Sequence, residues 1–167
     1  ERDNLTSCER SGVTEKNISS ASFVKAVKLA GTIALDTSVF IYQLEEHPTY
    51  QRLTDPLFSM IEQAHVTATA SALAYAEILV APFREHNHEL VSRYAAFLTY
   101  KVPTFKLVLP DFAILELAAE LRAQYQFLRL PDAIHLATAI ATESTLFITN
   151  DHKLATLPDI SVLILDE

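Results

Sequence analysis

The stretch T-I-A-L-D-T-S-V-F-I-Y, residues 32–42, decides the fold. Residues 32–35 form a short apolar run that is typical of a buried strand, and Asp36 ends it. The following residues, 38–44, are predicted to form a helix. A continuously apolar strand that leads directly into a helix is typical of a parallel sheet covered on both faces.

The rest of the chain repeats this alternation of short apolar runs and helical patterns. It predicts strands at 66–68, 105–109, 146–149 and 162–165, and helices at 48–64, 71–80 (ending near Pro82), 86–100, 110–124 and 131–141. We therefore predict an α/β fold over residues 30–167, a three-layer α/β/α sandwich around a mostly parallel sheet of about five strands. Residues 1–29 show no clear period and are expected to form an N-terminal extension of unknown role.

Composition narrows the class of protein. The 167 residues suffice for one domain, and 2 Gly and 1 Cys exclude a disulfide scaffold. The lone Cys8 favours a reducing compartment, the cytoplasm. The net charge of -8 argues against binding nucleic acid or membrane by bulk charge. We predict no membrane span, because Glu77 interrupts the longest apolar stretch, 66–83. We predict no signal peptide, because the first 22 residues are polar and mixed in charge.

Two acidic residues stand where open parallel sheets carry their active sites. Such sites form beyond the carboxyl ends of the strands, and Asp36 and Asp151 each follow a predicted strand. Each also has an ordinary alternative. Asp36 could cap the next helix, and Asp151 could belong to an Asn-Asp turn.

Two further acids lie on predicted helices. Glu77 is the only charged residue between 68 and 81, and a buried carboxylate there needs a cation, a metal or a proton. Its alternative is partial exposure on an Ala-rich face. An Asp after a Pro is common at the start of a helix, which is the ordinary alternative for Asp132, yet Asp132 lies at the rim of a mostly buried helix. His135 lies on the same helical face as Asp132. A histidine in such a place is more often a hydrogen-bonded core residue than a functional one, and a supporting role for His135 stays open.

Together the four acids suggest a divalent metal. Clustered carboxylates repel one another, and Mg²⁺ or Mn²⁺ relieves that repulsion through oxygen ligands. Such a site can bind a phosphodiester and orient water. The sequence holds no zinc-type cluster, no Walker loop and no G-x-S-x-G elbow. Zinc binding, nucleoside-triphosphate binding and serine catalysis therefore have no support in the sequence.

Four strings carry a family resemblance: I-A-L-D-T-S-V-F-I-Y from Ile33, A-L-A-Y-A-E-I-L-V-A-P from Ala72, L-R-L-P-D-A-I-H-L-A-T-A from Leu128 and F-I-T-N-D from Phe147. They resemble the PIN-domain family, and most of all the VapC toxins of bacterial toxin–antitoxin pairs. The resemblance covers the chain from Gly31 onward. It implies a Mg²⁺- or Mn²⁺-dependent endoribonuclease that acts on RNA without a protein nucleophile.

The resemblance also assigns roles to residues. It implies that Asp36 and Asp132 touch the metal most directly, while Glu77 and Asp151 act directly or through water. The hydroxyls of Thr37 and Thr149 lie near two of these acids in the sequence and are candidate neighbours of the metal site. The basic residues near the four strings, Arg84, Arg129 and Lys153, are candidate phosphate contacts, although plain surface charge is the commoner role of such cations.

The partners implied by the resemblance are a small antitoxin and a second copy of the chain. The antitoxin would lay a helix in a hydrophobic groove and send a basic tail to the acidic site, which suits the chain's acidity. Aromatic residues on the helices at 48–64 and 86–100 are the candidate anchors, with core packing as the commoner alternative for each: Tyr50, Phe58, Tyr94 and Tyr100.

Two other functions are weighed against the nuclease. An aspartyl-phosphate phosphatase of the haloacid dehalogenase type also places an Asp after its first strand, but it needs a second Asp where this chain has Ser38. A catalytically silent PIN-like module used for protein binding would not need all four acids. The nuclease is therefore the leading hypothesis.

Overall fold

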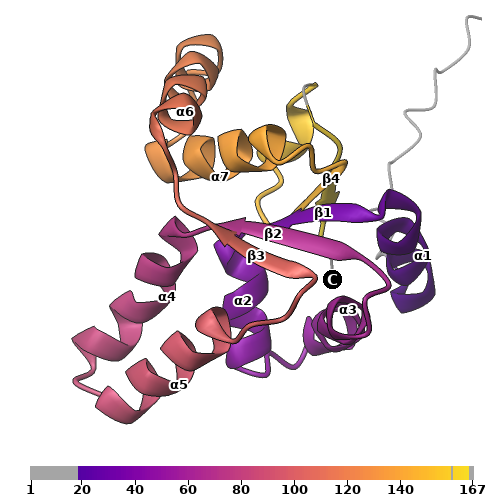
Figure 1. Cartoon of the computed structure of the whole chain (residues 1–167), viewed down its shortest axis with the longest axis vertical. Coiled ribbons are helices and arrows are strands. Elements are labelled where there is room, and N and C mark those ends of the chain that lie inside the picture. The colour runs from indigo at the N-terminus through magenta and orange to yellow at the C-terminus, as the bar shows by residue number, and fades with distance from the viewer. Residues whose placement is uncertain (1–18, 159, 166–167) are drawn as a thin grey trace, which may run out of the picture.

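The computed structural model describes residues 19–158 and 160–165. A single five-stranded sheet forms the middle layer (Figure 1), in the order β3-β2-β1-β4-β5, and all four neighbouring pairs are parallel. The strands are β1 (Thr32–Leu35), β2 (Thr67–Ser71), β3 (Phe105–Val108), β4 (Leu146–Thr149) and β5 (Val162–Ile164). The predicted α/β/α sandwich is confirmed. Cys8 lies outside the described residues.

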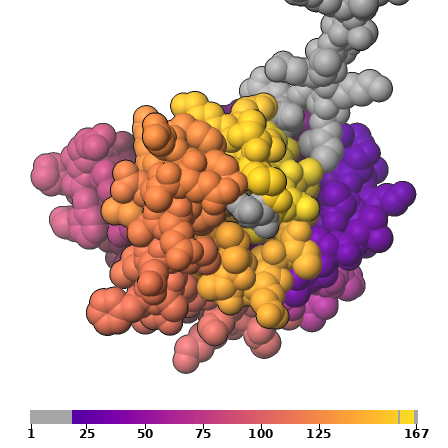
Figure 2. Space-filling view, turned by 90° about the horizontal axis from the view of Figure 1, so that it is seen from above, coloured from indigo at the N-terminus to yellow at the C-terminus, as the bar shows by residue number. Residues whose placement is uncertain are grey.

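Helices cover both faces of the sheet. One face packs against α1 (Ser20–Ala30), α2 (Thr37–Leu44), α3 (Gln51–Glu62), α4 (Leu73–Arg84) and α5 (His88–Thr99), and the other against α6 (Phe112–Gln124) and α7 (Leu130–Ala141). A short 3-10 helix, η1 (Leu154–Thr156), follows β4. Figure 2 shows α6 and α7, in orange, beside the yellow C-terminal segment.

The apolar strands follow from this double cover. Ile33 and Leu35 of β1 belong to the core under α2 and α3, whereas Ala34 between them belongs to the core under α7. Successive side chains of a strand point to opposite faces, so a strand buried on both sides is apolar at nearly every position.

The strand order fixes where a site can form. From β1 the chain runs to β2 and β3 on one side, and α6 and α7 then carry it across to β4 and β5 on the other side. The order therefore reverses between β1 and β4, and the crevice at such a switch point lies outside the carboxyl ends of the strands. Asp36 follows β1 there, and Asn150 and Asp151 follow β4.

Several elements differ from the sequence-based expectation. β2, expected over 66–68, runs over Thr67–Ser71. The pattern predicts no element before Gly31, yet α1 forms over Ser20–Ala30 and packs Phe23 and Val27, both 0% exposed, into the core. The helix expected to end near Pro82 runs on to Arg84 with Pro82 inside it. Pro82 lies in the last turn, where its missing N–H removes a single helical hydrogen bond, and its ring is buried.

In the described part of the chain, none of the helices is long and apolar enough to cross a bilayer.

Candidate active site at the carboxyl edge of the sheet

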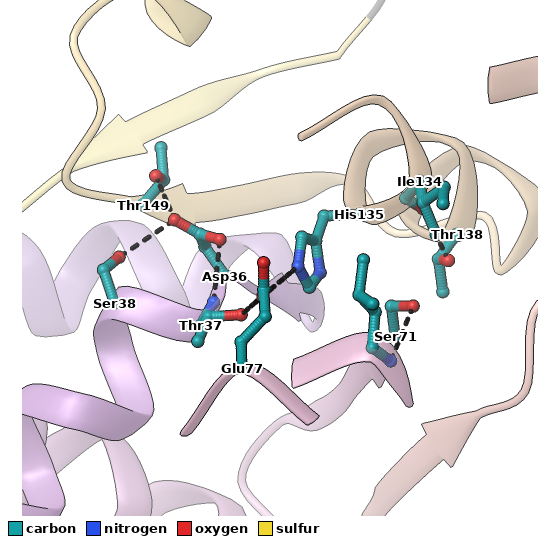
Figure 3. Close-up of polar contacts among 10 residues, drawn as sticks. Asp36, Thr37, Ser38, Ser71, Glu77, Ile134, His135, Thr138 and Thr149 are labelled. Carbon is teal, nitrogen blue, oxygen red and sulfur yellow. Dashed lines mark hydrogen bonds and ion pairs between the residues drawn. The ribbon is translucent and has the colours of Figure 1, made fainter. Parts of the chain in front are cut away.

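Asp36 is held by three donors. It caps α2, and its Oδ1 accepts a hydrogen bond from the backbone N–H of Thr37 at 2.7 Å. Its Oδ2 accepts from the hydroxyls of Ser38 at 3.0 Å and Thr149 at 2.6 Å (Figure 3). The helix-cap alternative is thus correct, and it does not compete with a site role. The cap aligns the carboxylate at the switch point between β1 and β4.

Glu77 points from α4 toward the same edge. Its Oε2 accepts hydrogen bonds from the Thr37 hydroxyl and from His135 Nε2, the latter at 2.8 Å (Figure 3). Its side chain is 32% exposed. Burial raises the pKa of Glu77, but the hydrogen bonds from His135 and Thr37 outweigh burial and leave that pKa below its ordinary value. Within the described residues no donor contacts Oε1, which leaves this oxygen for a ligand.

His135 is the buried partner of Glu77. It is 3% exposed, and its Nε2 also lies 3.2 Å from the Thr37 hydroxyl. Its Nδ1 is buried without a partner among the described residues. An N–H at Nδ1 would leave a donor unsatisfied at a cost of about 1–3 kcal/mol. The tautomer with its proton on Nε2, donated to Glu77, fits the geometry. The expectation of a hydrogen-bonded core histidine is confirmed.

Asp132 sits at the third residue of α7. Its Oδ2 accepts from the backbone N–H of Arg129 at 3.3 Å, as its helix-start alternative requires. The pKa of Asp132 lies above its ordinary value because of burial; the Arg129 hydrogen bond opposes the shift, and the negative charges of Asp36 and Asp151 add to it. Asp36 and Asp151 therefore lie close enough to Asp132 for their charges to act on it.

Asp151 is exposed and bends the chain after β4. Its N–H donates to the Thr149 hydroxyl at 3.1 Å, and its Oδ1 accepts from the Lys153 N–H at 2.9 Å, so the turn alternative also holds. A small polar pocket of about 160 Å³ is lined by Asp132 and Asp151 together with the cationic residues Arg129 and Lys153.

The third candidate cation lies apart from this pocket. Arg84 is the last residue of α4, about 10 Å beyond Glu77 along the helix axis, and it does not line the pocket. The structure thus brings two of the three candidate phosphate contacts to the acids and leaves Arg84 away from them.

The donor set fits a hydrated divalent cation. Among the described residues, no group of three or more His, Cys, Asp or Glu side chains comes together tightly enough to hold a metal ion. The acids instead offer separate carboxylate oxygens, and a cation would offset the negative charges of Asp36 and Asp151, which add to the effect of burial on the pKa of Asp132. Mg²⁺ keeps several waters and binds through one or two carboxylates. This chemistry suits Mg²⁺ or Mn²⁺.

A second candidate region lies between α3 and α5. Phe58, Phe97 and Tyr100 line an apolar groove of about 310 Å³, which we call the α3–α5 groove. Tyr100 is 70% exposed. Tyr50 and Tyr94, two of the four candidate anchors, are only 8% and 5% exposed, so the alternative of core packing is correct for both. Helical spacing shows which residues share a face but not which face a neighbouring helix covers.

Sequence reasoning missed a cluster beside the acids. Asn150 Nδ2 donates to the hydroxyls of Tyr42 at 2.8 Å and Tyr50 at 3.2 Å. Asn150 stands in the F-I-T-N-D string, which was the available signal. No local pattern links it to either tyrosine, because about a hundred residues separate them.

Comparisons with known proteins agree with this geometry. Three similar solved structures are a VapBC2 complex of Rickettsia felis bound to a promoter DNA fragment (17% identity, TM-score 0.65, 80% of this chain and 98% of that one), a toxin–antitoxin complex of Klebsiella pneumoniae (24%, 0.58, 81% and 98%) and FitAcB of Neisseria gonorrhoeae (22%, 0.60, 78% and 96%). At these identities the likeness shows the fold. Among curated proteins the chain has no significant match.

A match to a family model extends this result from fold to family. The model of the PIN domain matches residues 33–160, most of the chain, and this range contains Asp36, Glu77, Asp132 and Asp151. The chain therefore belongs to the PIN-domain family.

Proposed function

We propose that this chain is a divalent-metal-dependent endoribonuclease that hydrolyses RNA phosphodiester bonds. PIN-domain proteins are generally nucleases, and such nucleases generally use divalent metal ions. The observation that carries the proposal is the gathering of acids at the carboxyl edge of the sheet: Asp132 and Asp151 line one pocket, and the negative charges of Asp36 and Asp151 both act on Asp132. A protein that only binds other proteins has no need for such a cluster.

Asp36 and Asp132 would hold Mg²⁺ or Mn²⁺ directly, and Glu77 and Asp151 directly or through water. When bound, the ion supplies the positive charge that stabilises the negative charge developing on the phosphate. Asp36 is oriented by its three donors, and Glu77 presents Oε1 because Oε2 is engaged. Arg129 and Lys153, on the wall of the acidic pocket, are placed to contact RNA phosphates.

The hydroxyls of the site support the acids. Thr37 donates to Glu77, and Thr149 and Ser38 donate to Asp36, so these hydroxyls orient carboxylates and are not free nucleophiles. The arrangement supports attack by water on phosphorus. It also disfavours the phosphatase alternative, in which a second Asp would stand where Ser38 is.

The decisive experiment incubates the purified, partner-free chain with total RNA, with Mg²⁺ or Mn²⁺ and with excess EDTA. We expect cleavage at discrete sites that stops in EDTA. Full activity in excess chelator would contradict the metal requirement. If no RNA is cut in either metal, the silent binding module becomes the better account of the chain.

We further propose that the chain is the toxin of a toxin–antitoxin pair and acts in the cytoplasm. One similar structure, from Klebsiella pneumoniae, is described as a toxin–antitoxin complex, and another is VapBC2 of Rickettsia felis. An antitoxin helix would seat apolar side chains in the α3–α5 groove, and an Arg or Lys of its tail would bind the acids through charge-assisted hydrogen bonds. Leu109 and Phe112 are exposed large apolar side chains, which supports a homodimer as well.

Expression in bacteria tests the toxin proposal. The chain alone should arrest growth, and co-expression with the small protein encoded beside it should restore growth and yield a complex that salt weakens. Phe97→Glu in the α3–α5 groove should weaken the complex, whereas Leu29→Glu, at an exposed position on α1 that does not line the groove, should leave it intact. A harmless chain that co-purifies with nothing would refute the toxin proposal and leave the nuclease proposal standing.

A further inference from the structure

We infer that Asn150, clamped by the hydroxyls of Tyr42 and Tyr50, is a positioning residue that sets Thr149 and Asp151 in place for metal binding. The inference rests on the proposed function, because it concerns the same site. We call Asn150, Tyr42 and Tyr50 the Asn150 clamp. The acids Asp36, Asp132 and Asp151 do not belong to it.

The clamp joins three separate elements. Tyr42 comes from α2, Tyr50 immediately precedes α3, and Asn150 follows β4. One amide group, Nδ2 of Asn150, donates to both phenol oxygens, at 2.8 Å and 3.2 Å. The loop after β4 is thereby tied to the start of α3 and to α2, the helix that Asp36 caps.

The two tyrosines form a stiff support for this contact. Their rings stack with centroids 4.2 Å apart and planes at 24°, and His47 packs on both rings, at 5.1 Å and 4.8 Å. Tyr50 is buried and Tyr42 is half-buried. Packed aromatic rings of this kind have little rotamer freedom, so the phenol oxygens present fixed points to the loop.

The clamp acts on the acids through the residues on either side of Asn150. Thr149 donates from its hydroxyl to Asp36 Oδ2 at 2.6 Å, and the N–H of Asp151 donates back to that hydroxyl at 3.1 Å. Neighbouring Cα atoms are about 3.8 Å apart, so a displacement of Asn150 moves both residues. Fixing Asn150 therefore fixes the Asp36–Thr149 contact and the direction of Asp151 together.

Groups outside the direct ligands typically change metal affinity or activity by 10- to 100-fold when removed. A clamp that only joined helices would lower the stability of the fold and leave metal affinity unchanged. Metal affinity and thermal stability, measured side by side, therefore distinguish a positioning role from a purely structural one.

The test measures the Mn²⁺ dissociation constant and the melting temperature of the full-length chain without RNA. Asn150→Ala and the double variant Tyr42→Phe/Tyr50→Phe should each bind Mn²⁺ about tenfold more weakly than the unmodified chain. Tyr94→Phe is the matched control, because it removes the hydroxyl of another buried tyrosine away from the acids. Its Mn²⁺ affinity should stay within about twofold of the unmodified value.

A triple variant sharpens the test. Once both phenols are gone, the additional change Asn150→Ala should weaken Mn²⁺ binding little further, because the contact has already been lost. Fully additive effects would overturn the clamp. If Asn150→Ala does not fold, Tyr42→Phe and Tyr50→Phe, each of which removes one oxygen atom, decide the question alone.

The outcomes separate this inference from the proposed function. Unchanged Mn²⁺ affinity in the clamp variants, together with lost binding in Asp36→Asn, would overturn the clamp and uphold the metal site. An unmodified chain that does not bind Mn²⁺ would overturn both. Weakened binding in the clamp variants and unchanged binding in Tyr94→Phe would uphold both.

Discussion

The two ends of the sheet use the same residue types in different ways. Near its amino end, Thr69, Thr142 and Ser144 bond to one another through their hydroxyls at 3.1–3.2 Å. Thr145 donates to the backbone carbonyls of Ala30 and Thr32. At the carboxyl end, Thr37 and Thr149 donate to carboxylates instead.

This difference shows what turns a polar cluster into a site. The hydroxyls near the amino end satisfy one another, so the cluster is neutral and stabilises the fold. A carboxylate has acceptor capacity for about four hydrogen bonds. A hydroxyl that orients it therefore leaves oxygen free for a ligand, and the negative charge of the carboxylate is kept. The following predictions test this contrast.

The largest effect is expected from the acids. The double variant Asp36→Asn/Asp132→Asn should cut RNA more than about 100-fold more slowly, because even groups outside the direct ligands commonly contribute 10- to 100-fold. Its melting temperature without metal should be equal or higher, since charge repulsion is relieved. Initial cleavage rates and thermal melts measure both quantities. A double variant that cuts at the unmodified rate would end the assignment of the metal site.

Acid should weaken metal binding before it weakens the fold. The pKa of Asp132 is raised, so the carboxylate takes up a proton at a higher pH than usual, and Mn²⁺ affinity should fall by up to about tenfold per pH unit below that pKa. Protonation of Asp132 stabilises the metal-free fold, because it removes a charge that burial disfavours. The effect of Glu77 on stability has the opposite sign. Its lowered pKa contributes stability that is present above about pH 4.5 and is lost as the pH falls through the lowered pKa.

Mn²⁺ titrations and metal-free melts over the same pH range check this prediction. Asp132→Asn provides the control, because it should remove the early fall of affinity along with much of the affinity itself. Parallel loss of Mn²⁺ binding and of the fold would count against Asp132 as the first group to titrate.

A matched pair of isosteric variants compares the two ends directly. Thr149→Val removes a donor from Asp36 and should weaken Mn²⁺ binding about tenfold. Thr69→Val removes a hydroxyl from the neutral cluster and should cost about 1 kcal/mol of stability with no change in Mn²⁺ affinity. Calorimetric titration and denaturant unfolding measure the two quantities. Equal effects on Mn²⁺ affinity would erase the proposed distinction between the ends.

The smallest effect concerns the cations beside the acids. Lys153→Ala should weaken RNA binding a few-fold at low salt and reduce the salt dependence of binding by about one counterion. Arg84→Ala is the control, since Arg84 does not line the acidic pocket. Binding isotherms at several salt concentrations would show whether the two variants differ. Identical slopes would return Lys153 to plain surface charge.

Much of the architecture could be predicted from the sequence alone. Short apolar runs mark β1, β4 and β5, because a strand buried on both faces is apolar at nearly every position. The signal is weaker for β2, which is Thr-Ala-Thr-Ala-Ser, and for β3, which contains Lys106. Asp36 and Asp151 were found as acids that follow strands, and strand ends are local features. The α1 helix was missed because Phe23 and Val27, which it buries, form too short a pattern to stand out.

The tertiary structure decided the contacts. Glu77 meets Thr37 and His135 across 40 and 58 residues, and Asn150 meets Tyr42 across 108. No local pattern encodes such pairs, because they exist only when the sheet brings β1 and β4 together and α4 and α7 pack across the same edge. The same reason explains the burial of Tyr50 and Tyr94. The sequence by itself determined which residues carry charge and where strands end, and packing decided which donors hold each charge.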